Sequence, residues 1–489
     1  MNESFEALTP YLEKKRRLHY LICLLNYDIA TACPEDSIED LSDIFGSIDV
    51  EAASILQDPE YIALIKNAAK DPNLNDLERR LVEHELESIE FMEKVKPEQL
   101  ALWNKHASKS GEIWRKAKAK GDFSMWLPHL KNVVEDAREK AKIRQKEGQT
   151  LYDACLSFYE PDCNEAFLDS IFDPLKEYLL KKIPEVLSKK ETIEMPNLAY
   201  PKVKQEALSY RLLNLIGYNL KKGALRESEH PFSDNLSRND ARITTNYDLN
   251  DFRSSMFSVL HEGGHALEFQ HWPKEQYESY VEGFASMATC ETHSRFFENI
   301  LGRSKALMPM YRKILSETLD PSFGSLSDDE LFTLFNDVKL IANRCDSDEL
   351  TYSLHIILRY EIEKDLINGK LNVEDIPARW NQLTKEYLGV EITNDRDGCM
   401  QDVHWTDGSF GYFPSYALGN LYGAMILERM KEDIDVDALL FKGDFKPILD
   451  WLSKHDFAYD YRKPNEWIQK VTGKSLDPNA FVRYLEQKY

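Results

Sequence analysis

Hydrophobic side chains recur at helical spacing through most of the chain. The clearest case is the stretch Asn75–Val95, where apolar residues return every three to five positions and carboxylates fill the other face. Asp71-Pro72-Asn73 and Lys96-Pro97 stand at either end and act as helix breakers. The pattern predicts one amphipathic helix here, with the apolar positions Leu77, Leu81, Leu86, Ile89 and Met92.

Further helices are predicted where the same spacing resumes. Leu130–Lys146 is long and charged, with Pro128 at its start. Helical spacing returns over Phe167–Leu187 and Lys204–Leu220, and a loop over Glu191–Tyr200 separates these two stretches. No Gly/Ser-rich or Pro-rich linker divides the chain. We therefore predict a mainly α protein, a single multi-helical unit over residues 1–489 with a deep active-site cleft between two helical halves.

Strand signals are almost absent. Asp240–Thr245, rich in Ile and Thr, is the one convincing strand, and it follows a polar loop over Lys221–Asn239. It predicts one very small β element a short way upstream of residues 261–265. The edge of such a strand would let an extended peptide add main-chain hydrogen bonds.

The segment His261-Glu262-Gly263-Gly264-His265 carries the strongest chemical signal of the chain. Two histidines four residues apart share one helix face, and their imidazoles can meet one Zn²⁺ at about 2.0–2.1 Å each. Glu262 can then reach a metal-bound water without being a ligand, as in the zinc-hydrolase pattern H-E-x-x-H. Each glycine costs about 1 kcal/mol in a helix relative to Ala, so both must provide clearance, either for substrate or for a neighbouring helix.

A catalytic zinc site needs a third protein ligand. His271 lies ten residues after His261, as in the pattern H-E-x-x-H-x-x-G-x-x-H, but that pattern needs a glycine where this chain has Glu268. Because Glu268 continues the helix, His271 cannot fold back to the metal. We interpret His271 as an interface or surface residue.

The better candidate is Glu291, on a further helix that is predicted over Glu275–Asn299. Apolar and small residues surround it, and a carboxylate on an apolar helix face is costly unless it is paired or metal-bound. Glu282 is the alternative. Cys290 and His293 can also bind metals, but at the helical period they point away from the direction of Glu291.

Composition excludes several classes of partner. The chain has 61 basic and 84 acidic residues, a net charge of −23 and a pI near 5.1, so it would repel nucleic acid and anionic membranes. Seven cysteines without CxxC spacing fit a reducing compartment. No secretory signal or membrane-spanning run is visible, and we expect a cytoplasmic protein.

An ordered set of motifs spans most of the chain: Tyr152-Asp153, Tyr159-Glu160-Pro161, His230-Pro231-Phe232, Asp240-x-Arg242-x-Thr244, His261-Glu262-x-x-His265, Glu291, Arg344-x-x-Ser347-Asp348, Gly398-x-x-Gln401-Asp402-x-His404-Trp405, Gly411-Tyr412-Phe413-Pro414 and the ending from Arg483 to Tyr489. In this set the chain resembles the carboxypeptidase Taq family, the thermostable metallocarboxypeptidases of the HExxH-plus-Glu zinc peptidases. The resemblance implies their helical fold, and the habit of the family implies a homodimer.

The chain departs from the usual motifs of that family in several places. Cys290 and Thr292 flank Glu291 where the family usually has His and Ser. Asn343 and Ser347 replace an Ile and an Ala, and Tyr27-Asp28 stands where Trp-Asp is usual. If the residue at Cys290 supports a metal ligand, its change could weaken metal affinity about 10–100-fold.

The resemblance implies a zinc peptidase mechanism. Zn²⁺, with Co²⁺ as the alternative metal, would be held by His261, His265 and Glu291 and would lower the pKa of a bound water toward about 7. Glu262 would act as general base for that water and would then protonate the leaving amine.

Other side chains would bind the substrate. The tetrahedral oxyanion needs donors beside the metal, and Tyr412 and His404 are the candidates. A free α-carboxylate is best held by a planar guanidinium through two parallel hydrogen bonds. The candidates for substrate binding, led by the two arginines, are Arg344, Arg242, His230 and Gln401.

These assignments have structural alternatives. The arginines could pair with nearby carboxylates, His230 could anchor a loop and Tyr412 could be a packed aromatic residue; the candidate carboxylates are Asp240, Asp346 and Asp348. We expect a zinc carboxypeptidase that releases single residues from peptides with a free C-terminus. A zinc oligopeptidase or endopeptidase is the first alternative, and a non-catalytic zinc-dependent peptide-binding protein is the second.

Overall fold

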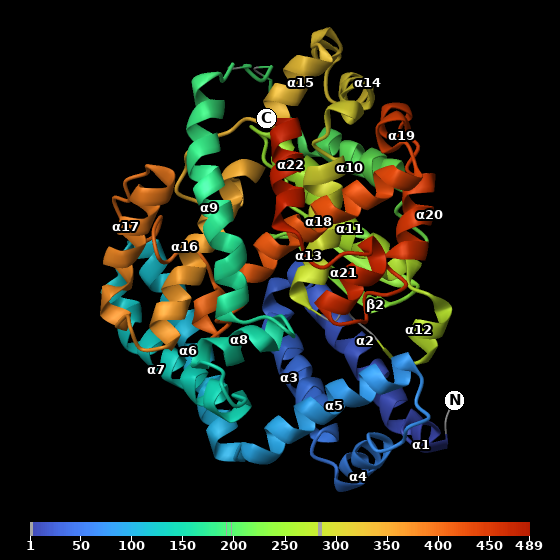
Figure 1. Cartoon of the computed structure of the whole chain (residues 1–489), viewed down its shortest axis with the longest axis vertical. Helices are drawn as coiled ribbons and strands as arrows, with labels where there is room; N and C mark the ends of the chain where they lie inside the picture. The colour runs from blue at the N-terminus through green and yellow to red at the C-terminus, as the bar shows by residue number, and fades with distance from the viewer. Residues whose placement is uncertain (1–2, 192, 197, 282–285) are drawn as a thin grey trace.

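The computed structural model describes residues 3–191, 193–196, 198–281 and 286–489. Helices dominate, as predicted (Figure 1). Those of the first half are α1 (Glu3–Glu6), α2 (Thr9–Thr31), α3 (Ile38–Ile55), α4 (Pro59–Ala68), α5 (Asp76–Lys94), α6 (Pro97–Lys120), α7 (Phe123–Arg144), α8 (Leu151–Tyr159), α9 (Glu165–Ser188) and α10 (Lys202–Ile216).

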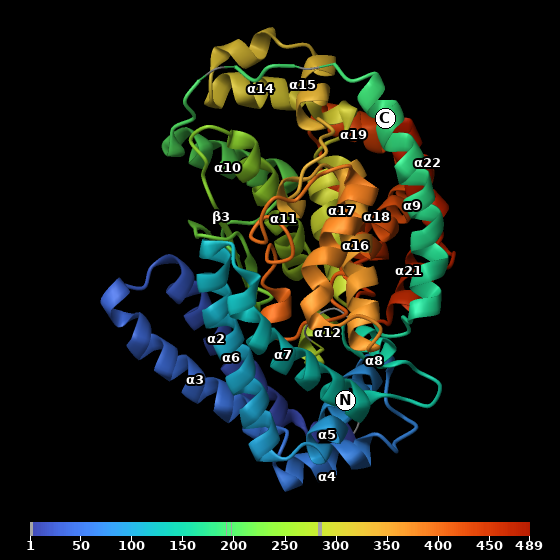
Figure 2. The same cartoon turned by 90° about the vertical axis from the view of Figure 1, so that its left-hand side faces the viewer.

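The second half adds the helices that hold the site. They are α11 (Phe252–His271), α12 (Lys274–Glu278), α13 (Met287–Arg295), α14 (Met308–Thr318), α15 (Asp328–Phe335), α16 (Glu349–Ile367), α17 (Ile376–Leu388), α18 (Pro414–Asp433), α19 (Val436–Lys442), α20 (Lys446–His455), α21 (Pro464–Thr472) and α22 (Pro478–Lys488). Helices α1 to α5 gather at one end of the molecule and α14 and α15 at the other, with α11 and α18 between them (Figure 1, Figure 2). Within the described residues, no helix could cross a membrane.

Helix α5 shows how local sequence sets these elements. Asn75 accepts a hydrogen bond from the backbone N–H of Glu78 at 2.9 Å, and Glu78 Oε2 accepts the Asn75 N–H at 3.0 Å. This capping box satisfies two amide groups that the helix cannot pair. Leu81 and Ile89 are buried on one face. The helix predicted across Asn75–Val95 is confirmed to within one residue at each end.

Helix α7 corrects the prediction at Pro128. The helix begins at Phe123, and Pro128 lies inside it rather than at its start. Asp122 caps the new start by accepting the Ser124 N–H at 3.0 Å. Proline removes one backbone hydrogen bond from a helix. Burial of Trp126 and Leu130 on either side offsets that loss.

The β element is larger than the sequence indicated. Strands β1 (Leu225–Glu227), β2 (Ser233–Ser237) and β3 (Asp240–Thr245) form one sheet in the order β1-β3-β2. β3 matches the predicted strand, but β1 pairs with it in parallel and β2 antiparallel. Because β3 is central, it has no free edge, and the expected peptide addition there is wrong. β1 and β2 lie in the predicted loop, where the polar sequence of β2 hides any strand alternation.

The helix predicted over Glu275–Asn299 is interrupted. α12 ends at Glu278, Tyr280 has a left-handed φ of 59°, and α13 begins only at Met287. Ser286 caps α13 by accepting the Thr289 N–H at 3.1 Å. A left-handed residue and a serine cap both compete with helix continuation, and apolar spacing reveals neither. Glu282, the alternative third ligand, lies outside the described residues.

Helices α11, α13 and α18 pack with their backbones almost in contact. A Cβ added to Gly264 of α11 would lie 2.7 Å from the carbonyl oxygen of His293, and one on Gly419 of α18 would lie 3.0 Å from the carbonyl carbon of Glu291. A Cβ on Gly263 would meet the side chain of Ile216 in α10 at 2.7 Å. Both glycines between the histidines therefore give clearance to neighbouring helices.

We expect Gly264→Ala to lower both stability and metal content. Its Cβ would push α13, which bears Glu291, away from α11, and overpacking of this kind costs about 1–3 kcal/mol. Gly263→Ala is the matched control, because the end of the Ile216 side chain can turn aside. Thermal unfolding and metal analysis of both variants would test this. Equal metal content in the two variants would contradict it.

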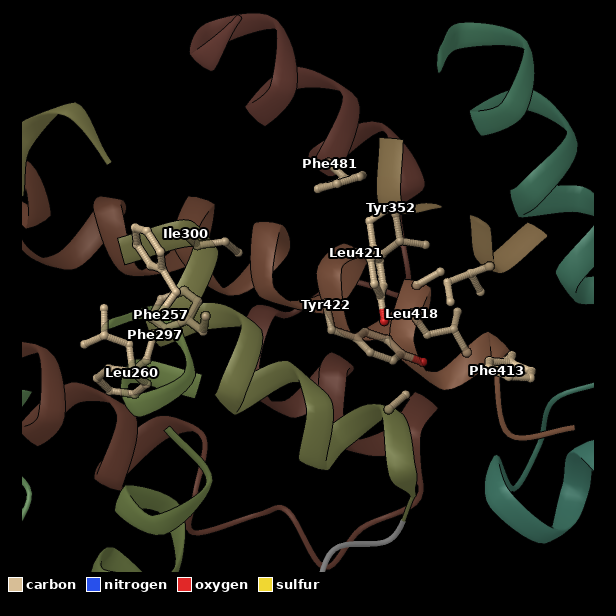
Figure 3. Packing of buried hydrophobic residues seen from close by; sticks show 14 of the residues in the cluster. Phe257, Leu260, Phe297, Ile300, Tyr352, Phe413, Leu418, Leu421, Tyr422 and Phe481 are labelled. Atoms are coloured by element: carbon tan, nitrogen blue, oxygen red, sulfur yellow. The ribbon is translucent and has the colours of Figure 1, made fainter. Parts of the chain in front are cut away.

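The surrounding core consists of two clusters of buried apolar side chains. The larger includes residues of α11, α16 and α18, and Figure 3 shows Leu260, Tyr352, Leu418 and others within it. The smaller joins α1 to α5 and includes Val281 from the segment after α12. The helices that carry the candidate metal ligands therefore lie in the larger core. The predictions of one unit over 1–489 and of a cleft between its halves stay predictions.

Candidate active site

Helix α11 presents both histidines of the motif on one face. The ring centroids of His261 and His265 are 5.1 Å apart, and Glu291 of α13 faces them. One ligand atom from each of these three residues lies within 4.8 Å of the others. His261 Nε2 is 3.8 Å from Glu291 Oε2. Two ligands of a tetrahedral ion at about 2.1 Å each lie roughly 3.4 Å apart, so the spacing fits a single metal ion.

Glu298 holds the ring nitrogen of His261 that faces away from the candidate metal position, and this residue was not predicted from the sequence. His261 Nδ1 lies 2.9 Å from Glu298 Oε2, which leaves Nε2 toward the metal position. Arg295 and Arg303 each approach the Glu298 carboxylate at 3.5 Å. Although burial raises the pKa of Glu298, Arg295 and His261 lower it to about 2, so it is ionised. Glu298 follows Glu291 by seven residues, two helical turns, and that spacing could have revealed it.

Cys290 lies behind the other histidine. Its Sγ is 3.3 Å from His265 Nδ1, the position in which a metal-bound histidine usually has an oxygen acceptor. Burial, with the charges of Glu268 and Glu291, raises the pKa of the Cys290 thiol well above its usual value. The departure from the family pattern at this position therefore touches a candidate ligand directly.

The two other histidines of this region point elsewhere. His293 Nδ1 lies 2.7 Å from Glu268 Oε2 and its Nε2 lies 3.2 Å from Asp456 Oδ1. His271 ends α11, and its Nδ1 approaches the Leu267 carbonyl oxygen at 2.8 Å. Neither belongs to the candidate metal group. The prediction that His271 does not fold back along a broken helix is consistent with the continuous α11.

The electrostatics suit a cation. Glu291 and Glu298 lie 4.0 and 3.5 Å from the guanidinium of Arg295, and the charges of both carboxylates also act on Glu262. Burial raises the pKa of Glu262 to about 7, opposed by His261 and assisted by Glu291. Two imidazoles and a carboxylate are also the ligand set that catalytic zinc prefers. The residues present therefore fit a divalent metal ion.

The predicted oxyanion donors lie together just before α18. The rings of His404 and Tyr412 are 5.3 Å apart, and Tyr416 packs against both. Burial raises the pKa of Tyr412, with the charges of Tyr416 and Glu291 adding to it, so its hydroxyl stays neutral. Burial and Arg344 lower the pKa of His404 to about 4. His404 Nε2 is 3.2 Å from the Tyr416 hydroxyl, and among the described residues its buried Nδ1 has no hydrogen-bond partner.

Arg344 pairs with neither of the two aspartates close to it in sequence. Its Nε donates to Asp402 Oδ1 at 2.6 Å and its Nη1 to the Tyr352 hydroxyl at 3.1 Å. The Tyr352 ring also stacks on Arg295, 4.2 Å away, and so links Arg344 to the metal group. The nearby aspartates have other roles, since Asp348 caps α16.

A second buried arginine shares the same carboxylate. Arg359 is fully buried, and its Nε donates to Asp402 Oδ2 at 2.7 Å. Its Nη2 donates to Gln401 Oε1 at 3.0 Å. Burial raises the pKa of Asp402, but Arg359 and Arg344 outweigh it and hold the pKa of this carboxyl well below its usual value. Two buried guanidiniums therefore face one ionised carboxylate, and a net positive charge remains.

The other substrate-binding candidates are placed differently. Arg242 donates from Nε to Asp240 Oδ1 at 2.9 Å and from Nη2 to Asp240 Oδ2 at 2.8 Å. This pairing is the structural alternative that the sequence allowed for Arg242. Gln401 donates to the Ala342 and Asp397 carbonyl oxygens while accepting from Arg359, so its amide is used inside the protein. The His230 side chain is 90% exposed, and its closest ionisable partner is Glu229 at 4.0 Å.

Two further buried carboxyl groups near the site were not predicted as site residues from the sequence. Glu160 accepts the Ala288 N–H, in the first turn of α13, and the Ser415 hydroxyl, both at 2.7 Å. Burial raises its pKa to about 7. By accepting both hydrogen bonds, Glu160 holds the first turn of α13 against the first turn of α18. The other is Glu363 of α16, which accepts the indole N–H of Trp405 at 2.6 Å.

Comparison with known proteins identifies the group to which these features belong. A family model described as carboxypeptidase Taq (M32) metallopeptidase matches residues 7–489. Carboxypeptidase 1 of Bacillus subtilis is 35% identical over 482 residues, covering 97% of this chain and 96% of its own. The chain belongs to this M32 family. Thermostable carboxypeptidase 1 of Pyrococcus furiosus is also similar, at 31% identity over 502 residues that cover 100% of both chains.

Solved structures of other M32 proteins share the fold. Trypanosoma cruzi metallocarboxypeptidase 1 matches with a TM-score of 0.95 at 31% identity, covering 100% of this chain and 99% of its own. A Pyrococcus furiosus carboxypeptidase structure matches with a TM-score of 0.95 at 30% identity, with the same coverage. The resemblance inferred from the motifs is thus confirmed. The chain is an M32 metallopeptidase, and its family implies a divalent metal that the candidate group fits.

Proposed function

We propose that this M32 protein is a zinc carboxypeptidase that removes single residues from the C-termini of peptides. The observation that carries the proposal is the combination of two sites. His261, His265 and Glu291 come together as a candidate metal group, and the buried Glu262 directly follows His261. Through Tyr352, this group is linked to Arg344, in a cluster whose positive charge is only half balanced.

The chemistry of hydrolysis follows from the metal group. A divalent metal held there supplies activation of a water and polarisation of the scissile carbonyl. Glu262 follows the ligand His261 directly, takes the proton of the attacking water and delivers it to the leaving amine. The same carboxyl must accept and then release a proton, and burial, which raises its pKa, favours the first of these steps.

Tyr412 and His404 supply donors for the oxyanion. Both groups are neutral, and burial keeps them in a low-dielectric setting where hydrogen bonds to a developing charge are strong. The Tyr416 hydroxyl lies against Nε2 of His404, so the proposal assigns the donor role to Nδ1, which requires the tautomer with its proton on Nδ1. Each well-aimed donor of this kind contributes about 3 kcal/mol to catalysis.

Arg344 is the side chain that binds the substrate carboxylate. Arg242 is paired with a carboxylate of its own, Asp240, whereas Arg344 shares its carboxylate, Asp402, with Arg359. Arg344 and Arg359 share one aspartate, so an incoming carboxylate would bring the cluster to two cations and two anions. Charge balance of this kind favours a free C-terminus over an amidated one.

The test is a mass-resolved time course on one peptide, either free or amidated at its C-terminus, with and without chelator. We expect a single-residue ladder that needs both the metal and the free carboxylate. Arg344→Ala should lower kcat/KM for the free acid about 100-fold, since a charged hydrogen-bond pair contributes up to about 3 kcal/mol. Arg242→Ala is the matched control and should leave the preference for the free acid over the amide intact.

Other outcomes would replace the proposal. Internal cuts that ignore amidation would make the protein an oligopeptidase or endopeptidase and would withdraw the role of Arg344. Metal binding without any cleavage would favour a zinc-dependent peptide-binding protein. Equal loss in the Arg344→Ala and Arg242→Ala variants would remove the distinction between the two arginines.

We also propose Zn²⁺ as the native metal, a cytoplasmic location and a homodimer. The two-imidazole, one-carboxylate group supports Zn²⁺ over harder ions. The cysteines of the described residues are all free thiols, in keeping with a reducing compartment. The acidic net charge of the chain disfavours nucleic acid and anionic membranes as partners. The homodimer rests on the habit of the family, and sedimentation analysis would test it.

A further inference from the structure

Glu363 of α16 is a fully buried carboxylate with three hydrogen-bond donors around it. Its Oε1 accepts the indole N–H of Trp405 at 2.6 Å. Its Oε2 accepts the backbone N–H of Gly411 at 2.9 Å and the hydroxyl of Tyr152, from α8, also at 2.9 Å. Among the described residues, no candidate metal ligand donates to Glu363. Of the cluster of Arg344, Arg359 and Asp402, only Arg359 acts on it, through its charge.

Two of the three donors, Trp405 and Gly411, belong to the segment of residues 404–412, so Glu363 packs against that segment. Trp405 directly follows His404, and Gly411 directly precedes Tyr412, so one carboxylate is bonded next to both proposed oxyanion donors. Within the segment, the Ser409 N–H donates to the His404 carbonyl oxygen at 3.0 Å. The carboxylate of Glu363 thus fixes the spacing between His404 and Tyr412.

Gly411 shows how closely the segment is seated. Its φ is +94°, and a Cβ added there would lie 2.8 Å from the carbonyl carbon of Cys155 in α8. The backbone at Gly411 therefore lies against α8 on one side and donates to Glu363 on the other. On the far side of Tyr412, the ring packs edge-on against Tyr159, 5.2 Å away. The direction of the Tyr412 side chain follows from these contacts.

A carboxylate suits this position better than any other group. Two of the three donors, the Trp405 indole and the Gly411 amide, are N–H groups that can only donate, and they lie on different oxygens. An amide side chain would turn its own NH₂ toward one of them and leave that N–H without an acceptor. Burial raises the pKa of Glu363 to about 7, and its three donors and Arg359 oppose that rise.

We propose that Glu363 is a positioning residue for peptide hydrolysis, which holds His404 and Tyr412 where the oxyanion develops. The inference rests on the function proposed above, since it acts through those two donors. A group that aligns oxyanion donors affects the transition state more than substrate binding. Its loss should therefore appear in kcat, with KM and the metal content little changed.

The test is a double-mutant cycle between Glu363→Gln and Tyr412→Phe. We expect Glu363→Gln to lower kcat about 10- to 100-fold and Tyr412→Phe about 100-fold. Because Glu363 acts through His404 and Tyr412 together, Glu363→Gln should cost clearly less in the Tyr412→Phe background than in the wild type, and the remaining loss is the part that passes through His404. Multiplication of the two effects would overturn the inference. Hydrogen exchange at the Gly411 amide gives a readout independent of activity and should be faster in Glu363→Gln.

Two control variants separate positioning from general stability. Glu361→Gln lies on the same helix, where Glu361 accepts the Tyr387 hydroxyl at 2.8 Å and Lys176 at 2.7 Å. Tyr152→Phe removes one donor to Glu363 but leaves both bonds to the 404–412 segment. Both should keep kcat within about threefold. If either falls as far as Glu363→Gln, the effect is one of stability and the inference fails.

The outcomes also separate this inference from the proposed function. If Tyr412→Phe leaves kcat unchanged, the oxyanion role of Tyr412 is wrong and the positioning inference falls with it. If Tyr412→Phe is slow while Glu363→Gln is normal, only the positioning inference is overturned. A loss of metal in Glu363→Gln would also overturn it, because none of the contacts of Glu363 leads to a metal ligand.

Discussion

The variant Glu262→Gln should lose about 10³-fold in kcat while it keeps its metal and its fold. Glu262 is 7% exposed and follows the candidate ligand His261 directly. General-base catalysis typically contributes about 10²–10⁴-fold, and glutamine cannot take a proton. The substitution is nearly isosteric and removes a charge that burial already disfavours. Steady-state kinetics, together with metal analysis of the same sample, measures the effect.

Glu262→Asp is the matched control for that prediction. Aspartate keeps the carboxylate but draws it back by one methylene, so activity should lie between wild type and Glu262→Gln. A kcat of Glu262→Gln within tenfold of wild type would assign the base to another group. A loss of metal from Glu262→Gln would instead show that Glu262 helps to hold the ion.

Much of the fold could be predicted from the sequence because its helices carry strong local signals. The capping box of Asn75 and Glu78 fixed the start of α5, and the Ile and Thr residues of Asp240–Thr245 marked β3. The errors arose where tertiary contacts override local preference. Burial of Trp126 keeps Pro128 inside α7, and β2 exists because β3 offers it a partner.

The candidate site was predictable to a different extent in its different parts. The three residues of the candidate metal group lie on two neighbouring helices, and the spacing of His261 and His265 already set the geometry of that pair. The pairing of Arg344 with Asp402 was not predictable, because the two residues come from distant segments and nearer aspartates offered a local alternative. Arg359 and Glu363 carry no motif signal and are recognised only by their buried partners.

Removal of the proposed third ligand by Glu291→Gln should weaken metal affinity by at least about 10³-fold and abolish peptide cleavage at limiting metal. Proteins bind structural Zn²⁺ with roughly 12 kcal/mol, and the loss of one ligand of three forfeits about a third of it. Ser294 donates to Glu291 Oε2 at 3.2 Å and would remain as a partner of the amide. Competition with a chromogenic chelator measures the affinity directly. Excess Zn²⁺ should restore part of the cleavage.

Substitution of the residues that contact Nδ1 of the two histidines should also weaken metal affinity, but by less than Glu291→Gln. Glu298→Gln weakens the acceptor of His261 Nδ1, and loss of such a partner costs about 10–100-fold in affinity. Cys290→Ala should cost less, because a neutral thiol is a much weaker acceptor for His265 Nδ1 than an ionised carboxylate. The expected order of loss is therefore Glu291→Gln, then Glu298→Gln, then Cys290→Ala. A loss in Cys290→Ala equal to that in Glu291→Gln would make the cysteine a metal ligand, and the assignment of Glu291 would have to be reconsidered.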